Sequence, residues 1–352
     1  MWFFRRRFGN IFDAVETLKR TDDAPMRIAF CVTGQLARLE LLSKIANVFI
    51  PNAQVGHTVH LYMLLDNRPE VHQTFWRNDY SKTPYVDFSE RKMESFIAQT
   101  VYSAKLGDQF VSHVRLESPS QDIFEVIDEF IPVLDKEINT DAQITKDDIG
   151  VNKKMFESGS IRFQNNLQWM GGVRDCVKWV QDREMEQRLF YDIIVRLRED
   201  TLVFDKWMFD RKKVKGFLTS ADLGSYNGIN DHNLVVDRKW ADTLFRGMIE
   251  DYYFNRTSRH QMWNNTEHHI YQIASDYSVE IQTASMCDMP LVPLRSKFIS
   301  THWLLHPQNA QYFIYCCMGN YEGEIGCTCS NDTQWLNLFD SGVSPVNWPE
   351  IN

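Results

Sequence analysis

The chain has 352 residues, and its 38 lysine and arginine residues against 47 aspartate and glutamate residues give a formal net charge of −9. An acidic surface repels nucleic-acid phosphates unless one face concentrates the basic residues, so this balance argues against a nucleic-acid-binding protein. Hydrophobic residues make up 43% of the chain, which is enough for a sizeable core and argues against intrinsic disorder.

Cysteine usage and apolar runs bear on the compartment of the protein. Seven cysteines are too few for a disulfide scaffold in a chain of this length, so we expect reduced thiols and a reducing compartment. The N-terminus has four apolar residues before Arg5, fewer than the roughly 7 to 15 of a signal peptide. No stretch approaches the roughly 20 apolar residues of a membrane span. The sequence therefore predicts a cytoplasmic protein without a membrane span.

The composition also bears on domain organisation. Glycine and proline number only 16 and 11, so long linkers are not expected. We predict one continuous domain over residues 26–310, preceded by an arm at 1–25 and followed by a tail at 311–352 that packs on the domain. A polar stretch near 135–158 is the best candidate for an insertion.

Apolar runs and helical periodicities alternate along the chain. A run at 26–34, closed by Gly34, predicts a buried strand, and a second strand at 57–66 ends in Asp66. Further strands are predicted at 110–116, 193–195, 233–236 and 279–283. Helices are predicted at 36–46, 90–103, 121–134, 161–190, 238–250 and 267–275. This alternation indicates an α/β fold with a mostly parallel sheet, covered on both faces and of a nucleotide-binding type.

Four charged residues directly follow the apolar strand core at 193–195. With a side-chain period of two, Arg196, Arg198 and Asp200 share one face of the strand, whereas Leu197 stays with the apolar residues. Ligands of open α/β sheets bind outside the carboxyl ends of the strands. Asp200 and Glu199 could hold Mg²⁺ or Mn²⁺ there, and the arginines could neutralise a diphosphate. The alternative is a surface ion-pair cluster that caps the strand.

Several segments resemble those of known enzymes. The segment 196–204, RLREDTLVF, resembles the R-x-R-x-D-x-x-F segment of glycosyltransferases with the GT-A fold, and 31–38, CVTGQLAR, resembles the opening of the same group. The segments 228–233 and 301–306 resemble parts of a plant and algal family. From about 26 to 306 the chain is similar to glycosyltransferases encoded by large DNA viruses of green algae. In the acidic motif, Arg198 occupies the first acidic position of the usual DxD.

The resemblance implies a GT-A-like nucleotide-sugar-binding fold and a catalytic role for the main domain. The implied activity moves a sugar from a UDP- or GDP-sugar donor to a hydroxyl of a glycan or glycoprotein acceptor, with Mn²⁺ or Mg²⁺ as the cofactor. If the protein is viral, the implied compartment is the host cytoplasm. The candidate donor-binding residues are Thr33, Gly34, Gln35, Arg38, Asp66, Arg174, Arg196 and Arg198. Gly34 as an ordinary turn and Asp66 as a helix cap are the simpler alternatives.

The remaining candidates concern the metal and the acceptor. The metal candidates are Asp200, Glu199, His302 and His306, because many GT-A enzymes add a late histidine and one helical face could present both histidines. Glu267 and Asp231 compete as the base that deprotonates the acceptor in an inverting enzyme. Trp263 and Trp303 are the candidate acceptor contacts. We expect buried thiols rather than zinc ligands at Cys316, Cys317, Cys327 and Cys329.

Two other functions compete with sugar transfer. A sugar nucleotidyltransferase would need a glycine-rich basic loop after the first strand, and residues 34–38 hold a single glycine. A non-catalytic glycan-binding relative would tolerate loss of the acids, but Glu199, Asp200 and Glu267 are all present.

Overall fold

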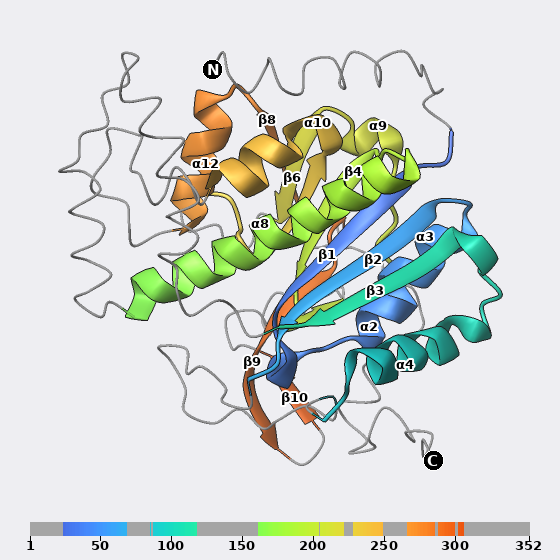
Figure 1. Ribbon diagram of the computed structural model, residues 1–352. Helices are drawn as coiled ribbons and strands as arrows, with labels where there is room; N and C mark the ends of the chain where they lie inside the picture. The colour runs from blue at the N-terminus through green and yellow to red at the C-terminus, as the bar shows by residue number, and fades with distance from the viewer. Residues whose placement is uncertain are drawn as a thin grey trace, which may run out of the picture.

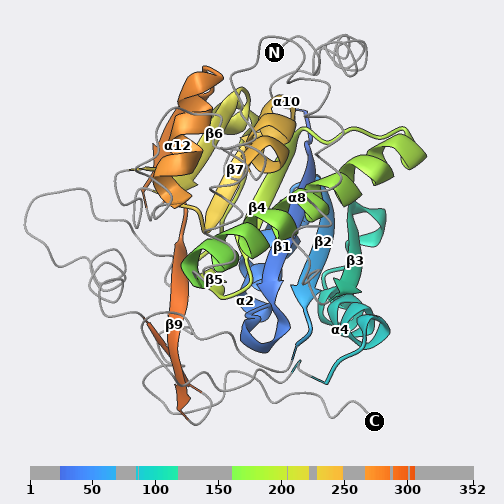
Figure 2. The ribbon, with the colours of Figure 1, turned by 60° about the vertical axis from the view of Figure 1, so that its left-hand side comes forward.

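The computed structural model describes residues 24–68, 85, 87–117, 161–203, 205–221, 228–248, 266–285, 288–299 and 302–305. Within these residues, seven strands form one sheet in the order β3-β2-β1-β4-β7-β6-β8, and Figure 2 shows the part of this order from β3 to β6. The strands are β1 (Arg27–Gln35), β2 (Thr58–Asp66), β3 (Phe110–Leu116), β4 (Ile193–Arg198), β6 (Phe217–Ala221), β7 (Asn233–Asp237) and β8 (Glu280–Ala284). The α/β fold with a mostly parallel sheet is confirmed.

Strand direction and order define one special edge of this sheet. Strands β3, β2, β1 and β4 are parallel, whereas β7 is antiparallel to both β4 and β6. From β1 the chain adds β2 and β3 on one side and β4 on the other, so the strand order reverses between β1 and β4. Open α/β sheets bind ligands outside the carboxyl ends of the strands at such a reversal point.

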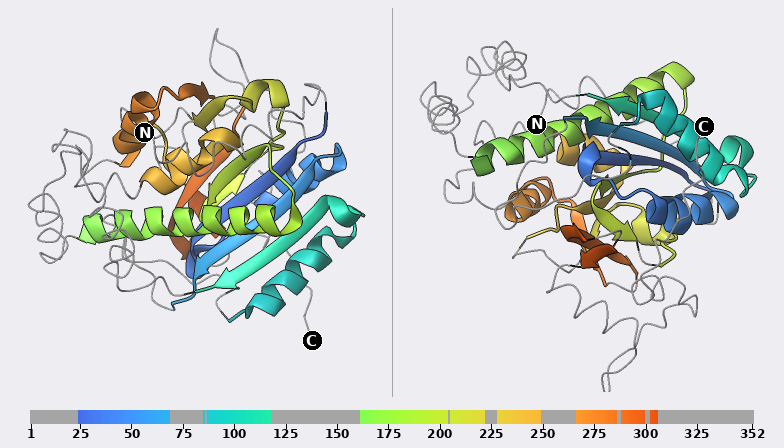
Figure 3. Two further views of the ribbon diagram at one scale, coloured as in Figure 1. Left: turned by 45° about the horizontal axis from the view of Figure 1, so that its top comes forward. Right: turned by 90° about the horizontal axis from the view of Figure 1, so that it is seen from below.

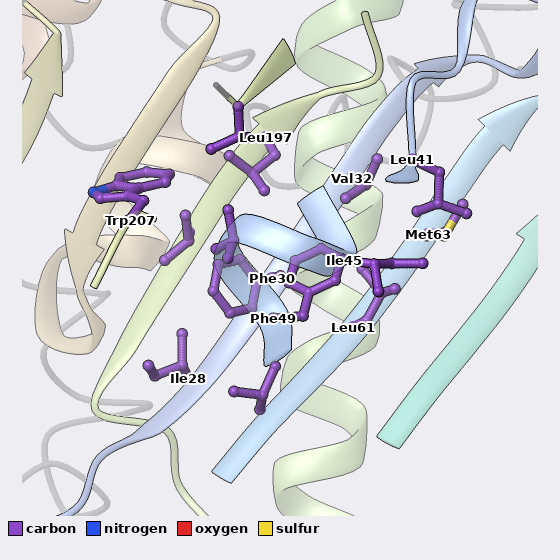
Figure 4. Packing of buried hydrophobic residues seen from close by; sticks show 14 of the residues in the cluster. Ile28, Phe30, Val32, Leu41, Ile45, Phe49, Leu61, Met63, Leu197 and Trp207 are labelled. Carbon is purple, nitrogen blue, oxygen red and sulfur yellow. The ribbon is translucent and has the colours of Figure 1, made fainter. Parts of the chain in front are cut away.

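Helices cover both faces of the sheet (Figures 1 and 3). One face carries α2 (Leu42–Lys44), α3 (Ile50–Gln54) and α4 (Glu90–Tyr102), and the other carries α8 (Ile161–Gln187), α10 (Arg238–Ala241) and α12 (Thr266–Asp276). Side chains of β1 alternate between the two cores: Phe30 packs on Phe49 with ring centroids 4.9 Å apart, as Figure 4 shows. Its neighbours Ala29 and Cys31 belong to the core under α8. This two-sided burial explains why the strand at 26–34 reads as a continuous apolar run.

The region after β1 differs from the helix expected at 36–46. A 3₁₀ turn spans Leu36–Arg38, and the helix begins only at Leu42, continues through a π-helical turn at Ile45–Phe49 and ends at Gln54. The reason is a long-range contact: the backbone N–H of Glu40 donates to the carbonyl of Glu199 at 2.9 Å, which holds residues 39–41 out of the helix.

Other elements were not predicted from the sequence. These are β5 (Thr201–Val203), α9 (Arg211–Val214), β6, β9 (Leu291–Ile299) and β10 (His302–Leu305), of which β10, β9 and β5 form a second sheet among the described residues. The sequence left open a helix that would present His302 and His306 on one face, but residues 302–305 form β10, which pairs antiparallel with β9. A strand rises about 3.3 Å per residue, so the close i, i+4 spacing of a helix is lost there.

Strand β1 and helix α8 are joined covalently. Cys31 and Cys176 form a disulfide with their Cα atoms 6.0 Å apart, and both are fully buried. The expectation that the thiols are reduced is therefore wrong for this pair, and the bond is of a kind that forms in oxidising environments.

Parts of the predicted organisation lie outside the described residues. They are most of the arm at 1–25, the helix at 121–134, the insertion near 135–158 and the tail at 311–352 with its four cysteines. In the part of the chain that is described, no helix is long and apolar enough to cross a membrane.

Candidate functional site

The carboxyl end of β1 lies directly against the turn that follows β4. Thr33 is paired with Arg198 in the sheet, and the backbone N–H of Glu199 donates to the carbonyl of Thr33 at 3.3 Å. Gly34 has φ +143, and a Cβ there would overlap the carboxylate of Glu199. Glycine is required for this close approach, so the position is not an ordinary turn.

Arg196 is buried beside this edge. Its side chain has 0% exposure, and none of its three guanidinium nitrogens has a hydrogen-bond partner in the described structure. The guanidinium carbon lies 4.5 Å from the ring centroid of Trp169 on α8, a cation–π distance. Burial lowers the pKa of Arg196 to about 10, although the charge of Asp231 opposes the shift. The site therefore contains a buried cation whose donors are unused.

Two further arginines hold the acids of the turn. Arg198 donates from Nε and Nη2 to both oxygens of Asp200, the second at 2.7 Å, and Arg38 donates from Nη2 to Oε1 of Glu199. Arg38 also lies 3.6 Å from Asp200. Burial alone would raise the pKa of Asp200, but the charges of Arg198 and Arg38 outweigh it and hold that pKa below its usual range. Both arginines keep 13–14% of their side chains exposed, whereas the acids keep 1%.

Lys44 anchors this turn, a role that was not predicted from the sequence. The side chain is fully buried at the C-terminal end of α2 and donates to the carbonyls of Glu40, Thr201 and, at 3.0 Å, Glu199. Burial lowers the pKa of Lys44 even though three nearby acids act in the opposite direction. Lys44 lies within an amphipathic helical segment, where a lysine ordinarily predicts a solvent-exposed position.

The two competing base candidates lie together. The hydroxyl of Thr266, at the start of α12, lies 3.0 Å from Oδ2 of Asp231 and 3.3 Å from Oε2 of Glu267. The loop of Asp231 reaches α12 because Gly228 has no side chain: a Cβ there would overlap the backbone of Glu267, and Ile229 donates to the carbonyl of Glu267 at 2.9 Å.

Electrostatics favour the ionised form of Asp231. Burial would raise its pKa, but His232, Arg196 and Arg198 lower it, and the net shift is downward. His232 lies 3.4 Å from Oδ1 of Asp231, and its carbonyl accepts from the backbone of Arg198 at 3.1 Å. The backbone of β4 thus links the arginines to the loop of Asp231, which in turn contacts Thr266 at the start of α12.

Gln35, Asp66 and Arg174, three of the remaining donor candidates, are found in different settings. Gln35 is buried, and its side-chain oxygen has no partner among the described residues. Asp66 pairs with Gln35 in the sheet register and accepts four hydrogen bonds from three nitrogens of Arg68 at 2.6–3.0 Å, which the sequence did not suggest. Arg174 lies on α8 and donates from Nε to the adjacent Asp175 at 2.8 Å.

The structure describes only part of the late-histidine and acceptor-tryptophan candidates. His302 and Trp303 belong to β10, and Trp263 and His306 lie outside the described residues.

Whether Asp200 and Glu199 can bind a divalent cation depends on which of their oxygens already accept hydrogen bonds. Mg²⁺ and Mn²⁺ take oxygen ligands. Both oxygens of Asp200 accept from Arg198, and of the two oxygens of Glu199 only Oε2 is without a partner. Across the described part of the chain, no three His, Cys, Asp or Glu side chains gather as a metal site. The acids in this arrangement do not fit the expected Mn²⁺ or Mg²⁺, and charge compensation at this edge falls to the arginines.

Comparisons with protein families and with curated proteins found no match. No model of a protein family matches the chain, and no curated protein is similar to it in sequence.

Proposed function

We propose that the protein is a glycosyltransferase of the GT-A type, which binds a nucleoside-diphosphate sugar at the carboxyl ends of β1 and β4 and transfers the sugar to a hydroxyl of a glycan. The observation that carries this proposal is the gathering of Arg38, Arg196 and Arg198 at the point where the strand order reverses, with the donors of Arg196 unused. Guanidinium groups match the oxygens of a diphosphate, which is the leaving group of the reaction.

The end of β1 supports the same assignment. Gly34 leaves room for the carboxylate of Glu199, which occupies the place of a Cβ, and the unpaired oxygen of Gln35 can accept from a ribose hydroxyl or a base. Oε2 of Glu199 is a second unpaired acceptor at this place. Charged donors beside unpaired acceptors, one an amide oxygen and one a carboxylate oxygen, suit a ligand that carries both phosphates and hydroxyls.

Breaking the bond between the sugar and the diphosphate leaves negative charge on the departing phosphate. The partly exposed Arg38 and Arg198 stabilise this charge directly. The buried Arg196 adds the electrostatic effect of its positive charge. Electrostatic stabilisation by groups already in position is usually the largest contribution to such catalysis.

Asp231, in the loop before β7, and Glu267, at the start of α12, supply the other half of the reaction. Asp231 is ionised at neutral pH, so it can accept a hydrogen bond from the attacking hydroxyl. A carboxylate with a lowered pKa is a weak general base, which makes orientation of that hydroxyl the better role for Asp231. Glu267 lies within reach of the same Thr266 hydroxyl. Its carboxylate is then the general base that accepts the proton of the attacking hydroxyl if the enzyme inverts.

An assay with the full chain tests the proposal. Incubation with a panel of UDP- and GDP-sugars is expected to release the nucleoside diphosphate from at least one donor. Arg198→Gln is expected to abolish the release, because it removes the bidentate donor at the rim. Arg183→Gln is the matched control, because Arg183 pairs with Glu186 on the surface of α8. This variant is expected to keep its activity.

Other results of this assay contradict the proposal. Formation of a nucleotide sugar and pyrophosphate from a nucleoside triphosphate indicates a nucleotidyltransferase. Glycan binding without release from any donor indicates a non-catalytic glycan-binding protein.

A further inference from the structure

We propose that Glu199 and Asp200 are exchangeable counter-ions of the arginines rather than metal ligands, so that the nucleoside diphosphate takes their place and binds without a divalent cation. This inference rests on the proposed function and concerns how the same site holds its donor.

Charges at this edge are already balanced. Three guanidinium groups, of Arg38, Arg196 and Arg198, lie with the carboxylates of Glu199, Asp200 and Asp231. A divalent cation would add positive charge next to three cations and would need oxygens that the arginines occupy. A diphosphate needs the reverse, namely donors that can turn away from their present partners.

Arg38 and Arg198 are able to make this exchange. They are the partly exposed members of the group, whereas their acids are buried. A phosphate offers the same bidentate geometry as the carboxylate of Asp200, so Arg198 keeps two hydrogen bonds when it passes to the phosphate, while Asp200 gives up the two that it accepts from Arg198. The acids keep the arginines paired and in place until the ligand arrives.

Arg196 favours the form of the site in which the diphosphate is bound. Its guanidinium is buried over Trp169 with three unused donors, and its strongest attractive charge is Asp231 rather than either acid of the turn. A buried cation without hydrogen bonds is costly, so an anion that arrives next to it is favoured over water. The chain thereby supplies positive charge where a metal ion would otherwise be required.

Titration calorimetry with the full chain tests the inference. UDP and GDP are the probes, each measured in EDTA and again in MnCl₂. Binding of at least one nucleotide in EDTA, with a Kd within about threefold of the value in MnCl₂, is expected. Binding only in MnCl₂ overturns the inference and leaves the proposed function standing, whereas absence of binding in both buffers overturns both.

A variant separates the two roles of Asp200 by the sign of its effect. Asp200→Asn keeps the shape of the side chain and releases Arg198, so binding in EDTA is expected to be as tight as in the wild type or tighter. A metal ligand predicts the opposite, a loss of about tenfold or more, and any weakening in a folded variant contradicts the inference.

The matched control is Asp192→Asn, because Asp192 also pairs with an arginine, Arg211 at 2.8 Å, but at the amino end of β4. It is expected to leave nucleotide affinity unchanged. Should Asp200→Asn fail to fold, the comparison of EDTA with MnCl₂ on the wild type still decides the question.

Discussion

Gly34 is the residue at which the backbone of β1 meets the acids of the site. We expect Gly34→Ala to destabilise the protein by about 2–3 kcal/mol, because the left-handed backbone is strained with a side chain and because the new Cβ displaces the carboxylate of Glu199. The free energy of unfolding from urea denaturation measures this loss.

A second glycine separates the two causes. Gly107 also has a positive φ, +55, but nothing lies within 4 Å of its Cβ position. Gly107→Ala is expected to cost only the backbone strain, about 1 kcal/mol. An equal loss in the two variants would show that Glu199 does not depend on Gly34.

Arg196 is expected to trade stability for binding. Arg196→Met keeps a long apolar side chain over Trp169 and removes a buried cation without hydrogen bonds, so the free energy of unfolding should stay the same or rise by about 1 kcal/mol. Affinity for the nucleoside diphosphate should fall about tenfold or more.

The adjacent Leu197 supplies the control for Arg196. Leu197 is fully buried in the opposite core, and Leu197→Met is expected to cost less than about 1.5 kcal/mol and to leave affinity unchanged. A fall of several kcal/mol in Arg196→Met would mean that Arg196 is a structural residue of the core.

Periodicity alone predicted several of these residues. The period of two in β4 placed Leu197 with Ile193 and Val195, and the structure confirms that all three share one core. It could not predict that Arg38 pairs with Glu199, because no local pattern links residues 161 apart in sequence. Lys44 was missed for the same reason, since its partners are carbonyls of distant backbone.

At the scale of elements, the strand β3 was predicted with its observed bounds, and β1, β2 and α4 within one residue at each end. These elements have clear periodicity and buried faces, which are the strongest sequence signals. Strands β5, β6 and β9 were not predicted from the sequence because they are short or pair with strands far along the chain. The antiparallel direction of β7 also follows from tertiary packing rather than from its own residues.

The disulfide between β1 and α8 gives a prediction at this scale. The double variant Cys31→Ala, Cys176→Ala is expected to lose about 2–5 kcal/mol of unfolding free energy, because the bond closes a loop of 145 residues in the unfolded chain. Urea denaturation with and without dithiothreitol measures it.

Reduction provides the control. Dithiothreitol should lower the stability of the wild type toward that of the double variant and should leave the double variant nearly unchanged. A double variant as stable as the oxidised wild type would contradict a structural role for the bond.

For the whole molecule, stability is expected to fall as the pH drops below about 6.5. Burial lowers the pKa of His60 and of His269 to about 4, so in the folded state both stay neutral while the unfolded chain takes up protons. The unfolded state then binds more protons, and the free energy of unfolding decreases between pH 6.5 and 4, by up to about 3 kcal/mol for each histidine.

His60→Gln tests this assignment. The variant removes one titrating group beside Tyr191, so the slope of stability against pH between 4 and 6.5 should become shallower than in the wild type. An unchanged slope would assign the acid sensitivity to other groups. The same comparison above pH 7 shows the packing cost of the substitution alone.

The net charge of −9 concerns the molecule as a whole and not its site. Most acids lie elsewhere, and the three arginines at this edge of the sheet are matched there by the carboxylates of Glu199, Asp200 and Asp231, so the site is close to neutral within an acidic molecule. An acidic protein can therefore hold a polyanionic ligand without a basic surface.

A structure of the full chain with UDP or GDP, whichever binds, tests the central claim most directly. We predict that the diphosphate lies at the carboxyl ends of β1 and β4, with its oxygens within about 3.2 Å of nitrogens of Arg38 and Arg198. We also predict that the ribose or base lies against Gly34 and Gln35. A nucleotide bound elsewhere, or a diphosphate held through a metal ion on Asp200 while Arg198 stays paired, would contradict the account.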